Sequence, residues 1–222
     1  MTTARPAAVL WDLDGTLVDT EPYWMASETE LVRRHGGSWD RDDALGLVGA
    51  PLLSSARVLQ RHGVRMSGPE IVEWLTDRVL ERMTERMPWR PGAVELLEAL
   101  HAAGTPTALV TMSIRRMAER VQLALPFPAF DVVVAGDDVV NGKPHPEAYL
   151  RAAALLGVDA SACIAIEDSL PGMTSAAAAG AVVIGIPAHV PVPAGVDDVR
   201  WPSLAGRTVD DLRRAYARGA AA

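Results

Sequence analysis

Short apolar runs rich in β-branched residues recur along the 222-residue chain and are typical of buried strands. Five such strands are expected, at Ala7–Trp11, Pro106–Val110, Val132–Ala135, Cys163–Ile166 and Val182–Ile186. From residue 89 onward the runs alternate with segments of helical spacing. Helices are expected there at Pro91–Gly104, Ser113–Leu125, Pro146–Gly157 and Leu170–Ala179. This alternation predicts an α/β fold, a doubly wound parallel sheet with helices on both faces.

Residues 18–88 have a different pattern, because helical spacing continues there without a convincing strand. Three helices are expected, at Glu21–His35, Leu52–His62 and Pro69–Met87, the last with Ile71, Leu75, Val79 and Met83 on one face. A helical stretch that interrupts a strand-helix alternation predicts an inserted domain of packed helices. We therefore expect a core domain from residues 1–17 and 89–222 and an all-helical domain over 18–88. The segment Pro187–Gly206 has no clear period, and Val209–Arg218 is expected to be a closing helix.

Composition narrows the classes of protein that fit. Hydrophobic residues make up 49% and charged residues 22% of the chain, the balance of a globular protein. The net charge of −7 gives no uniform basic face, which argues against a nucleic-acid partner. Signal-length apolar segments and runs of about 18 apolar residues are absent, and the single cysteine, Cys163, lies in an apolar run. We expect a cytoplasmic protein that binds no membrane and is a monomer or weak dimer.

Two acids follow the first predicted strand, in the segment Asp12-Leu13-Asp14-Gly15-Thr16. Alternate residues of an extended strand point to the same side, so both carboxylates can serve one site. The carboxyl end of a strand in a parallel sheet is also where open α/β folds bind their ligands. A simple Asp-Gly turn is the alternative. Against it, a charge at the end of a buried strand is costly unless a cation compensates it.

Three further segments supply candidate partners for these acids. Thr111 follows the second predicted strand just before a helix, where a hydroxyl and free N–H groups suit an anion; taken alone, it also fits an ordinary helix cap. Lys143 is the only lysine among 21 basic residues and lies between Gly142 and Pro144; taken alone, it fits a solvated surface charge. Glu167-Asp168 ends the fourth strand. Carboxylates at two strand ends suggest a site for a hard divalent cation such as Mg²⁺.

Together these segments resemble the four ordered motifs of the haloacid dehalogenase-like (HAD) hydrolase superfamily. The motifs are Asp12-Leu13-Asp14-Gly15-Thr16, Thr111, Lys143 within Gly-Lys-Pro-His-Pro, and Glu167-Asp168. The resemblance runs from Ala7 to about Ile186 and is greatest to the branch with a helical cap after the first motif. That branch includes phosphoglycolate phosphatases, sugar phosphatases and β-phosphoglucomutase. The resemblance implies a Rossmann-like core with residues 18–88 as the cap domain.

The resemblance also implies a function: Mg²⁺-dependent hydrolysis of a small phosphorylated metabolite through an aspartyl phosphate. Asp12 would be the nucleophile, and Asp14 would protonate the leaving alcohol and then activate water. Thr111, Lys143 and the Met112 N–H would bind the phosphate. The expected metal ligands are the Asp12 side chain, the Asp14 carbonyl and Asp168, with Glu167 acting through water.

Alternative reactions leave different signatures in this superfamily. Dehalogenases lack an acid at the place of Asp14, and the phosphonate-cleaving branch needs a cap lysine, which this chain lacks. A mutase relative has an arginine just after a glycine resembling Gly49, where this chain has Ala50. Arg57 or Arg61 could take that place, or they could be solvated. A sugar phosphomutase and a non-catalytic phosphometabolite-binding relative therefore stay open as alternatives.

Two residues of the motif loops have open roles. His145, next to the lysine motif, is either a turn residue or an acid-base group. Met112 has a bulkier side chain than many relatives carry at this position, so we expect it to narrow the pocket.

Overall fold

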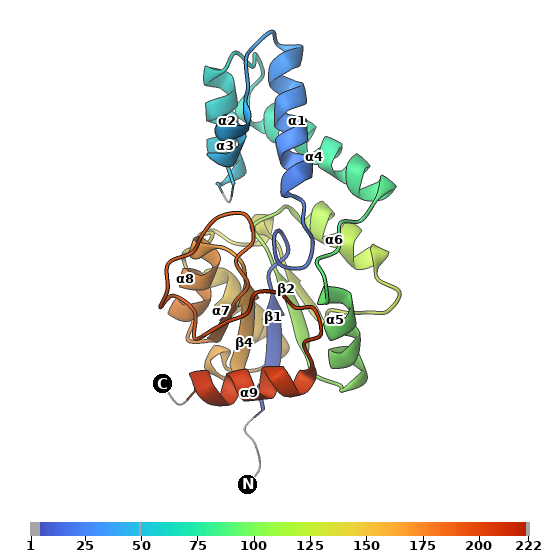
Figure 1. Cartoon of the computed structure of the whole chain (residues 1–222), viewed down its shortest axis with the longest axis vertical. Coiled ribbons are helices and arrows are strands. Elements are labelled where there is room, and N and C mark those ends of the chain that lie inside the picture. Colours follow the sequence, from blue (N-terminus) through green and yellow to red (C-terminus); the bar gives the residue numbers. More distant parts are fainter. Residues whose placement is uncertain (1–4, 49, 221–222) are drawn as a thin grey trace. The chain divides into compact units, whose positions relative to one another are not determined.

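The computed structural model describes residues 5–48 and 50–220 and divides into two compact units (Figure 1). The first unit ends at Val18 and resumes at Trp89, and the second is Asp19–Pro88. The second unit differs from the predicted insertion, 18–88, only in Val18. That this unit acts as a cap stays a prediction.

The first unit contains a parallel sheet with strand order β3-β2-β1-β4-β5-β6. Its strands are β1 (Ala8–Trp11), β2 (Thr107–Val110), β3 (Val132–Val134), β4 (Cys163–Glu167), β5 (Val182–Gly185) and β6 (Val199–Arg200). The chain builds outward from β1 to β3 and then returns to place β4 on the other side of β1. The strand order thus reverses at β1, where α/β sheets bind ligands beyond the strands' carboxyl ends.

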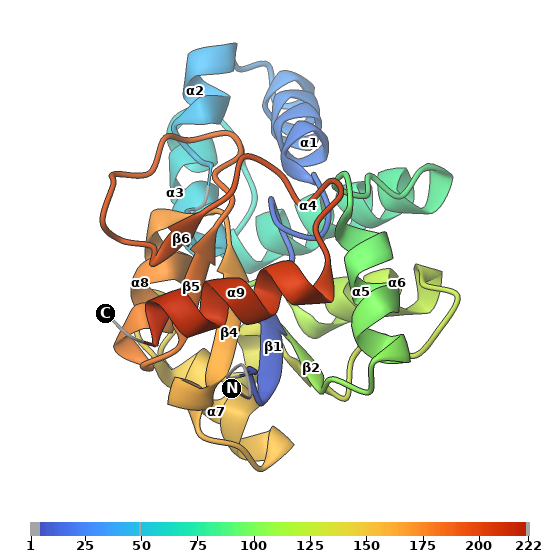
Figure 2. The same cartoon turned by 60° about the horizontal axis from the view of Figure 1, so that its bottom comes forward.

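Helices cover both faces of this sheet, which confirms the predicted doubly wound α/β fold. They are α5 (Ala93–Ala102), α6 (Arg115–Ala124), α7 (Glu147–Leu156), α8 (Leu170–Ala178) and α9 (Val209–Gly219). Helices α5 and α9 contact each other on one side of the sheet, and α7 and α8 contact each other on the opposite side (Figure 2). On the α7 side, Leu10, Ala108 and Ala165 are neighbours in register and lie in one buried cluster with Tyr149. The small side chains of Ala108 and Ala165 let α7 approach the strands closely.

The second unit consists of helices α1 (Glu21–Arg34), α2 (Arg41–Leu45), α3 (Leu52–Arg61) and α4 (Gly68–Glu85), and its described residues include no strand. The apolar face expected on α4 is buried, with all four predicted residues no more than 1% exposed. Ser67 and Glu70 form a reciprocal cap at the start of α4, which satisfies backbone N–H groups there. The spacing of apolar residues and the cap together explain where this helix begins and which face it buries.

Three local details differ from the sequence prediction. Strand β6 and helix α2 were not expected, because segments of two and five residues are too short to show a period. Helix α6 begins at Arg115, so the expected start at Ser113 is wrong by two residues. The cause is a tight turn in which the Ser113 N–H donates to Thr111 Oγ1 at 2.9 Å.

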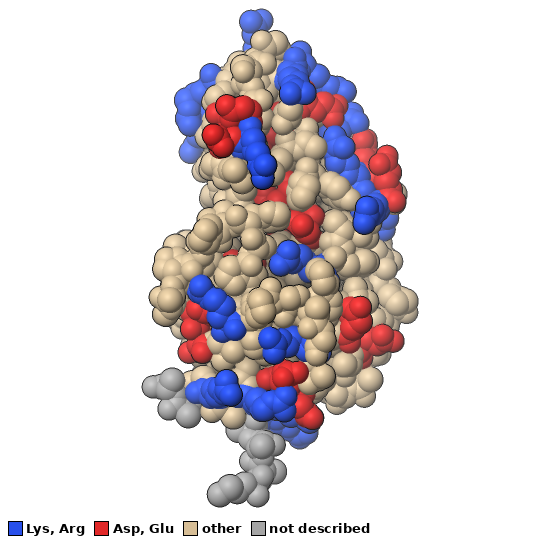
Figure 3. Space-filling model, viewed as in Figure 1, with Lys and Arg blue, Asp and Glu red and all other residues tan. Residues whose placement is uncertain are grey.

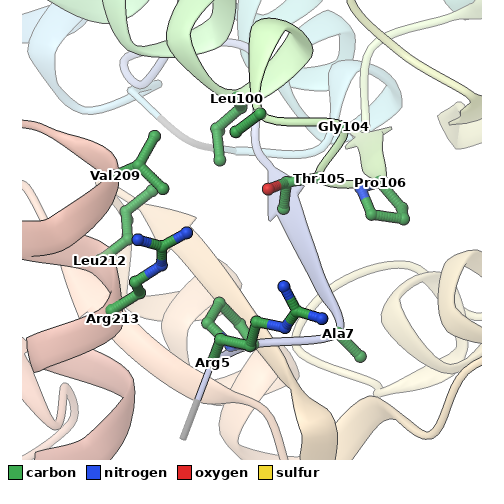
Figure 4. Close-up of a pocket in the computed structure, with 11 residues that line it drawn as sticks. Arg5, Ala7, Leu100, Gly104, Thr105, Pro106, Val209, Leu212 and Arg213 are labelled. Atoms are coloured by element: carbon green, nitrogen blue, oxygen red, sulfur yellow. The ribbon is translucent and has the colours of Figure 1, made fainter. Parts of the chain in front are cut away.

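A cavity of about 400 Å³ lies at the amino ends of β1 and β2, opposite the strand ends that carry the motifs. Its walls come from the segments before both strands, from the end of α5 and from the start of α9, with Arg5 and Arg213 at its sides (Figure 4). Because it opens at the far edge of the sheet, it is separate from the predicted site.

Basic and acidic side chains are mixed along α9 on the face shown in Figure 3. Arg213 pairs with Asp210 at 2.8 Å, and Arg214 pairs with Asp211 at 2.7 Å. Within the described residues, we find no helix with the length and apolar character required to cross a membrane.

Candidate active site

The predicted site residues of the first unit meet at the carboxyl ends of three neighbouring strands. Asp12 directly follows β1, Thr111 directly follows β2, and Glu167 is the last residue of β4. Lys143 reaches the same place from the loop before α7. Asp12 is 7%, Thr111 1% and Glu167 0% exposed, so the site is built into the end of the buried sheet.

Lys143 is the cation that the buried Asp12 requires. Its Nζ donates hydrogen bonds to Asp12 Oδ1 at 2.7 Å, to Glu167 Oε1 at 2.6 Å and to the Val110 carbonyl at 2.9 Å. Only 5% of the lysine side chain is exposed. These contacts exclude the interpretation of Lys143 as a solvated surface charge.

The acids at the site are buried and crowded, which raises the pKa values of Asp12 and Asp168. Burial, followed by repulsion from Glu167, raises the pKa of Asp12 to about 7, although Lys143 opposes the shift. Burial and the charges of Asp12 and Glu167 also raise the pKa of Asp168 well above its usual value. Burial alone would lower the pKa of Lys143, but Asp12 and Glu167 outweigh it and raise that pKa. One ammonium group therefore does not neutralise this cluster, and a further cation would stabilise the ionised acids.

Asp12, Glu167 and Asp168 form a group that could hold such a cation. One carboxylate oxygen from each lies within 4.8 Å of the others. Gly15 allows this approach: it has a φ of +84°, and a Cβ on it would lie 2.0 Å from Asp168 Oδ2. An all-oxygen donor set fits a hard cation such as Mg²⁺.

Asp14 faces a different set of partners from Asp12. Ser113 Oγ donates to Asp14 Oδ2 at 2.5 Å, and Thr111 Oγ1 lies 3.5 Å from the same oxygen. The two acids of the first motif are thus differentiated, one held by an ammonium group and the other by hydroxyls. That arrangement suits a nucleophile and a separate proton carrier.

The Met112 side chain lies against the lysine loop. Its Sδ accepts the Lys143 backbone N–H at 3.2 Å, and a Cβ on Gly142 would come within 2.9 Å of the sulfur. The effect on pocket width that we expected from Met112 stays a prediction. These contacts show that the Met112 side chain links the segment after β2 to the loop that carries Lys143.

Comparison with known proteins shows the family. The family model described as haloacid dehalogenase-like hydrolase matches residues 6–180. The chain belongs to the haloacid dehalogenase-like hydrolase family. It is therefore a hydrolase, as the resemblance of its motifs implied.

Individual members of the family resemble most of the chain. Hexitol phosphatase A of Escherichia coli (strain K12) is 34% identical, over 85% of this chain and 87% of the relative. Validoxylamine A 7'-phosphate phosphatase of Streptomyces hygroscopicus subsp. limoneus is 30% identical, over 88% and 96%. The crystal structure of CbbY from Rhodobacter sphaeroides in complex with phosphate has a TM-score of 0.84 and 29% identity, covering 93% of this chain and 99% of that one.

The structure also bears on the residues whose roles the sequence left open. His145 has 53% of its side chain exposed, and its Nδ1 accepts the N–H of Glu147 at the start of α7, which favours the turn interpretation. Arg57 and Arg61 are exposed on α3. Gly49 lies outside the described residues.

Two side chains at the candidate active site, Ser113 and Tyr149, were not predicted from the sequence. Ser113 is the hydroxyl that holds Asp14, and its position between Thr111 and the helix was a usable signal. Tyr149 donates to Glu167 Oε1 at 2.7 Å from within α7. In the sequence Tyr149 looks like any core residue on an apolar helix face, so no local signal marks it.

Proposed function

We propose that this protein is a Mg²⁺-dependent phosphatase that hydrolyses a small phosphorylated metabolite through an aspartyl phosphate on Asp12. One observation carries the proposal: the buried Asp12 carboxylate is held by Lys143 within an acid cluster, while Asp14, two residues along, has its own hydroxyl partners. A nucleophile, a cation and an independent proton carrier are the groups that phosphoryl transfer through an enzyme carboxylate requires.

The reaction divides into two displacements at phosphorus. An Asp12 oxygen forms a bond to phosphorus while the bond to the substrate alcohol oxygen breaks, and Asp14 gives that oxygen a proton. Asp14, now ionised, takes a proton from a water molecule as the water oxygen attacks the aspartyl phosphate. The Asp12 oxygen leaves, and inorganic phosphate is released. Lys143 and the Thr111 hydroxyl offset the negative charge on the transferred phosphoryl group throughout.

The cluster of Asp12, Glu167 and Asp168 supports the proposal of a bound metal ion. We assign Asp12, Asp168 and the Asp14 carbonyl as ligands, with Glu167 acting through water. When bound, Mg²⁺ supplies positive charge to the phosphoryl oxygens and offsets the repulsion among the acids.

The substrate class that we propose is the phosphate monoester of a polyhydroxylated small molecule, such as a sugar or sugar alcohol. Support comes from relatives at least 30% identical that are named hexitol phosphatase and validoxylamine A 7'-phosphate phosphatase. A mutase would need a cation to hold a second phosphate, and this chain has Ala50 at the position where a mutase relative has an arginine. We therefore favour the phosphatase over the sugar phosphomutase.

The test is release of phosphate from a panel of hexitol, hexose and short-chain phosphates with Mg²⁺ present. The wild type should be active, and Asp12→Asn should lose activity by about 10³-fold or more because the nucleophile is gone. Asp210→Asn, at an acid on α9 with 68% of its side chain exposed, is the matched control and should stay active. Equal rates for wild type and Asp12→Asn would refute the proposal. Interconversion of hexose phosphates without phosphate release would establish the mutase, and binding without turnover the non-catalytic alternative.

A further inference from the structure

Tyr149 is a fully buried residue of α7 that contacts two charged groups of the site. Its hydroxyl donates to Glu167 Oε1 at 2.7 Å, the same oxygen that accepts Lys143 Nζ at 2.6 Å. The ammonium group of Lys143 also lies 5.0 Å from the centre of the Tyr149 ring, within the range of a cation–π contact. The tyrosine thus contacts both members of the Lys143–Glu167 ion pair.

The Glu167 carboxylate is fixed from more than one side. Its Oε2 accepts from Ser169 Oγ at 3.2 Å, and a Cβ on Gly172 would lie 2.0 Å from the carboxylate. Glu167 is 0% exposed, so bulk solvent does not reach its carboxylate. The Tyr149 hydroxyl therefore supplies one of a small number of donors that hold this charge.

Lys143 Nζ is shared between two carboxylates, Asp12 and Glu167. A donor to Glu167 Oε1 offsets part of the negative charge on that oxygen and weakens its competition for the ammonium group. Without that donor, Glu167 would attract Lys143 Nζ more strongly, and the contact with Asp12 at 2.7 Å would weaken.

We propose that Tyr149 is a positioning residue of the reaction: through Glu167 it keeps the Lys143 ammonium group beside Asp12. This inference rests on the proposed phosphatase function, because the reacting group that it serves is Asp12. The Tyr149 hydroxyl contacts Glu167 and not the nucleophile or the proton carrier, and it acts on Lys143, the cation between Asp12 and Glu167.

The first test is Tyr149→Phe, which keeps the ring and its packing and removes only the hydroxyl. We expect kcat to fall about tenfold, the effect of losing a hydrogen bond to a charged group, with KM within about twofold of the wild type. Tyr216→Phe is the matched control, since the Tyr216 hydroxyl makes a longer contact of 3.5 Å to the Ser161 carbonyl. The control should keep wild-type kcat.

A double-mutant cycle then asks whether Tyr149 acts through Glu167. In a Glu167→Gln background, Tyr149→Phe should change kcat by less than about twofold, because the effects of substitutions at two interacting residues are not additive. Loss of folded protein would instead lower turnover in both backgrounds, and melting curves of each variant check it directly.

The possible outcomes distinguish failure of the positioning role of Tyr149 from failure of the proposed phosphatase function. An active wild type with unchanged kcat in Tyr149→Phe, or an equal loss in both backgrounds, overturns the positioning role alone. A wild type that releases no phosphate from any substrate of the panel overturns the proposed function and the positioning role together. Loss of kcat in the wild-type background only supports the inference.

Discussion

Lys143 Nζ and Asp12 Oδ1 lie 2.7 Å apart although 131 positions separate the two residues in the chain. Two further acceptors, Glu167 Oε1 and the Val110 carbonyl, complete the surroundings of the ammonium group. An ammonium group has three N–H donors, and three acceptors receive them here. The only lysine of the chain therefore fits its site by geometry as well as by charge.

Exchange of Lys143 for arginine should lose most of the activity, although the charge is kept. Only 5% of the side chain is exposed, and a planar guanidinium group is wider than an ammonium group. We expect kcat to fall by about 100-fold or more. Arg213→Lys, the reverse exchange on α9 at a side chain 40% exposed, is the control and should leave kcat unchanged. Near-normal turnover of Lys143→Arg would show that charge alone matters at this position.

Much of the fold could be predicted because its elements have strong local periods. The β-branched runs and the α4 face with Ile71, Leu75, Val79 and Met83 are each determined by burial of a repeating set of positions. Strand β6 has two residues and exists only because it pairs with β5. Strand β5 was predicted from its own apolar run, but a two-residue strand that depends on pairing with another segment has no local period, so β6 could not be predicted from the sequence.

The candidate site likewise contains some residues that could be predicted from the sequence and others that could not. Asp12, Thr111 and Glu167 were predictable because each ends an apolar strand, and parallel strands bring their carboxyl ends together. For Lys143 the surface interpretation was the ordinary one, and only the resemblance to the family motifs favoured a buried role. Tyr149 has no such marker, since a tyrosine on an apolar helix face packs in a core far more often than it contacts a charged site.

Replacement of Ser113 by alanine should affect substrates according to their leaving groups. The Ser113 hydroxyl donates to Asp14 Oδ2 at 2.5 Å and holds the proposed proton donor in place. Alkyl phosphates need a proton on the leaving oxygen, whereas p-nitrophenolate leaves with little help. We expect kcat/KM to fall about tenfold for a hexitol phosphate and by less than about threefold for p-nitrophenyl phosphate.

Thr174→Ala is the control for Ser113→Ala. Its hydroxyl also makes a hydrogen bond, to the Leu170 carbonyl at 2.8 Å, but lies exposed on α8. The control should leave both substrates unaffected. Equal losses for both substrates in Ser113→Ala would contradict an effect on proton donation and would indicate a general disturbance of the Thr111 turn.

Gly15 is a position where added bulk should remove the metal site. A Cβ there would lie 2.0 Å from Asp168 Oδ2, in addition to the strain of a φ of +84°. Gly15→Ala should therefore displace the Asp168 carboxylate. We expect 10 mM Mg²⁺ to raise the melting temperature of the wild type by about 3–6 °C and that of Gly15→Ala by less than about 1 °C.

Gly195 offers the matched control, with a φ of +87° and no atom within 4 Å of an added Cβ. Gly195→Ala carries the same backbone strain without the clash, so it should melt lower than the wild type and still respond fully to Mg²⁺. If Gly15→Ala and Gly195→Ala respond equally to Mg²⁺, then Asp168 is not a ligand that depends on Gly15.

Glu28, in the helical unit, should make stability depend on pH. This residue of α1 is 5% exposed, and its Oε2 has no hydrogen-bond partner among the described residues. Burial, followed by repulsion from Glu21, raises the pKa of Glu28 from 4.5 to about 8. Between these two values the folded protein keeps the proton that the unfolded chain has lost, so stability falls as pH rises through this window. Above about pH 8 the group is ionised in both states, and its cost no longer grows.

Glu28→Gln removes this charge and should therefore stabilise the protein more at high pH than at low pH. Because a buried carboxamide also lacks partners, we expect a net gain of about 2 kcal/mol at pH 8.5, or about 4–8 °C in melting temperature. At pH 5, where Glu28 is protonated in the folded state, the two proteins should melt within about 2 °C of each other. Glu98→Gln, at an exposed position of α5, should show the same small difference at both pH values. A constant difference between wild type and Glu28→Gln across this range would mean that Glu28 is ionised in the folded protein, with a partner that offsets its burial.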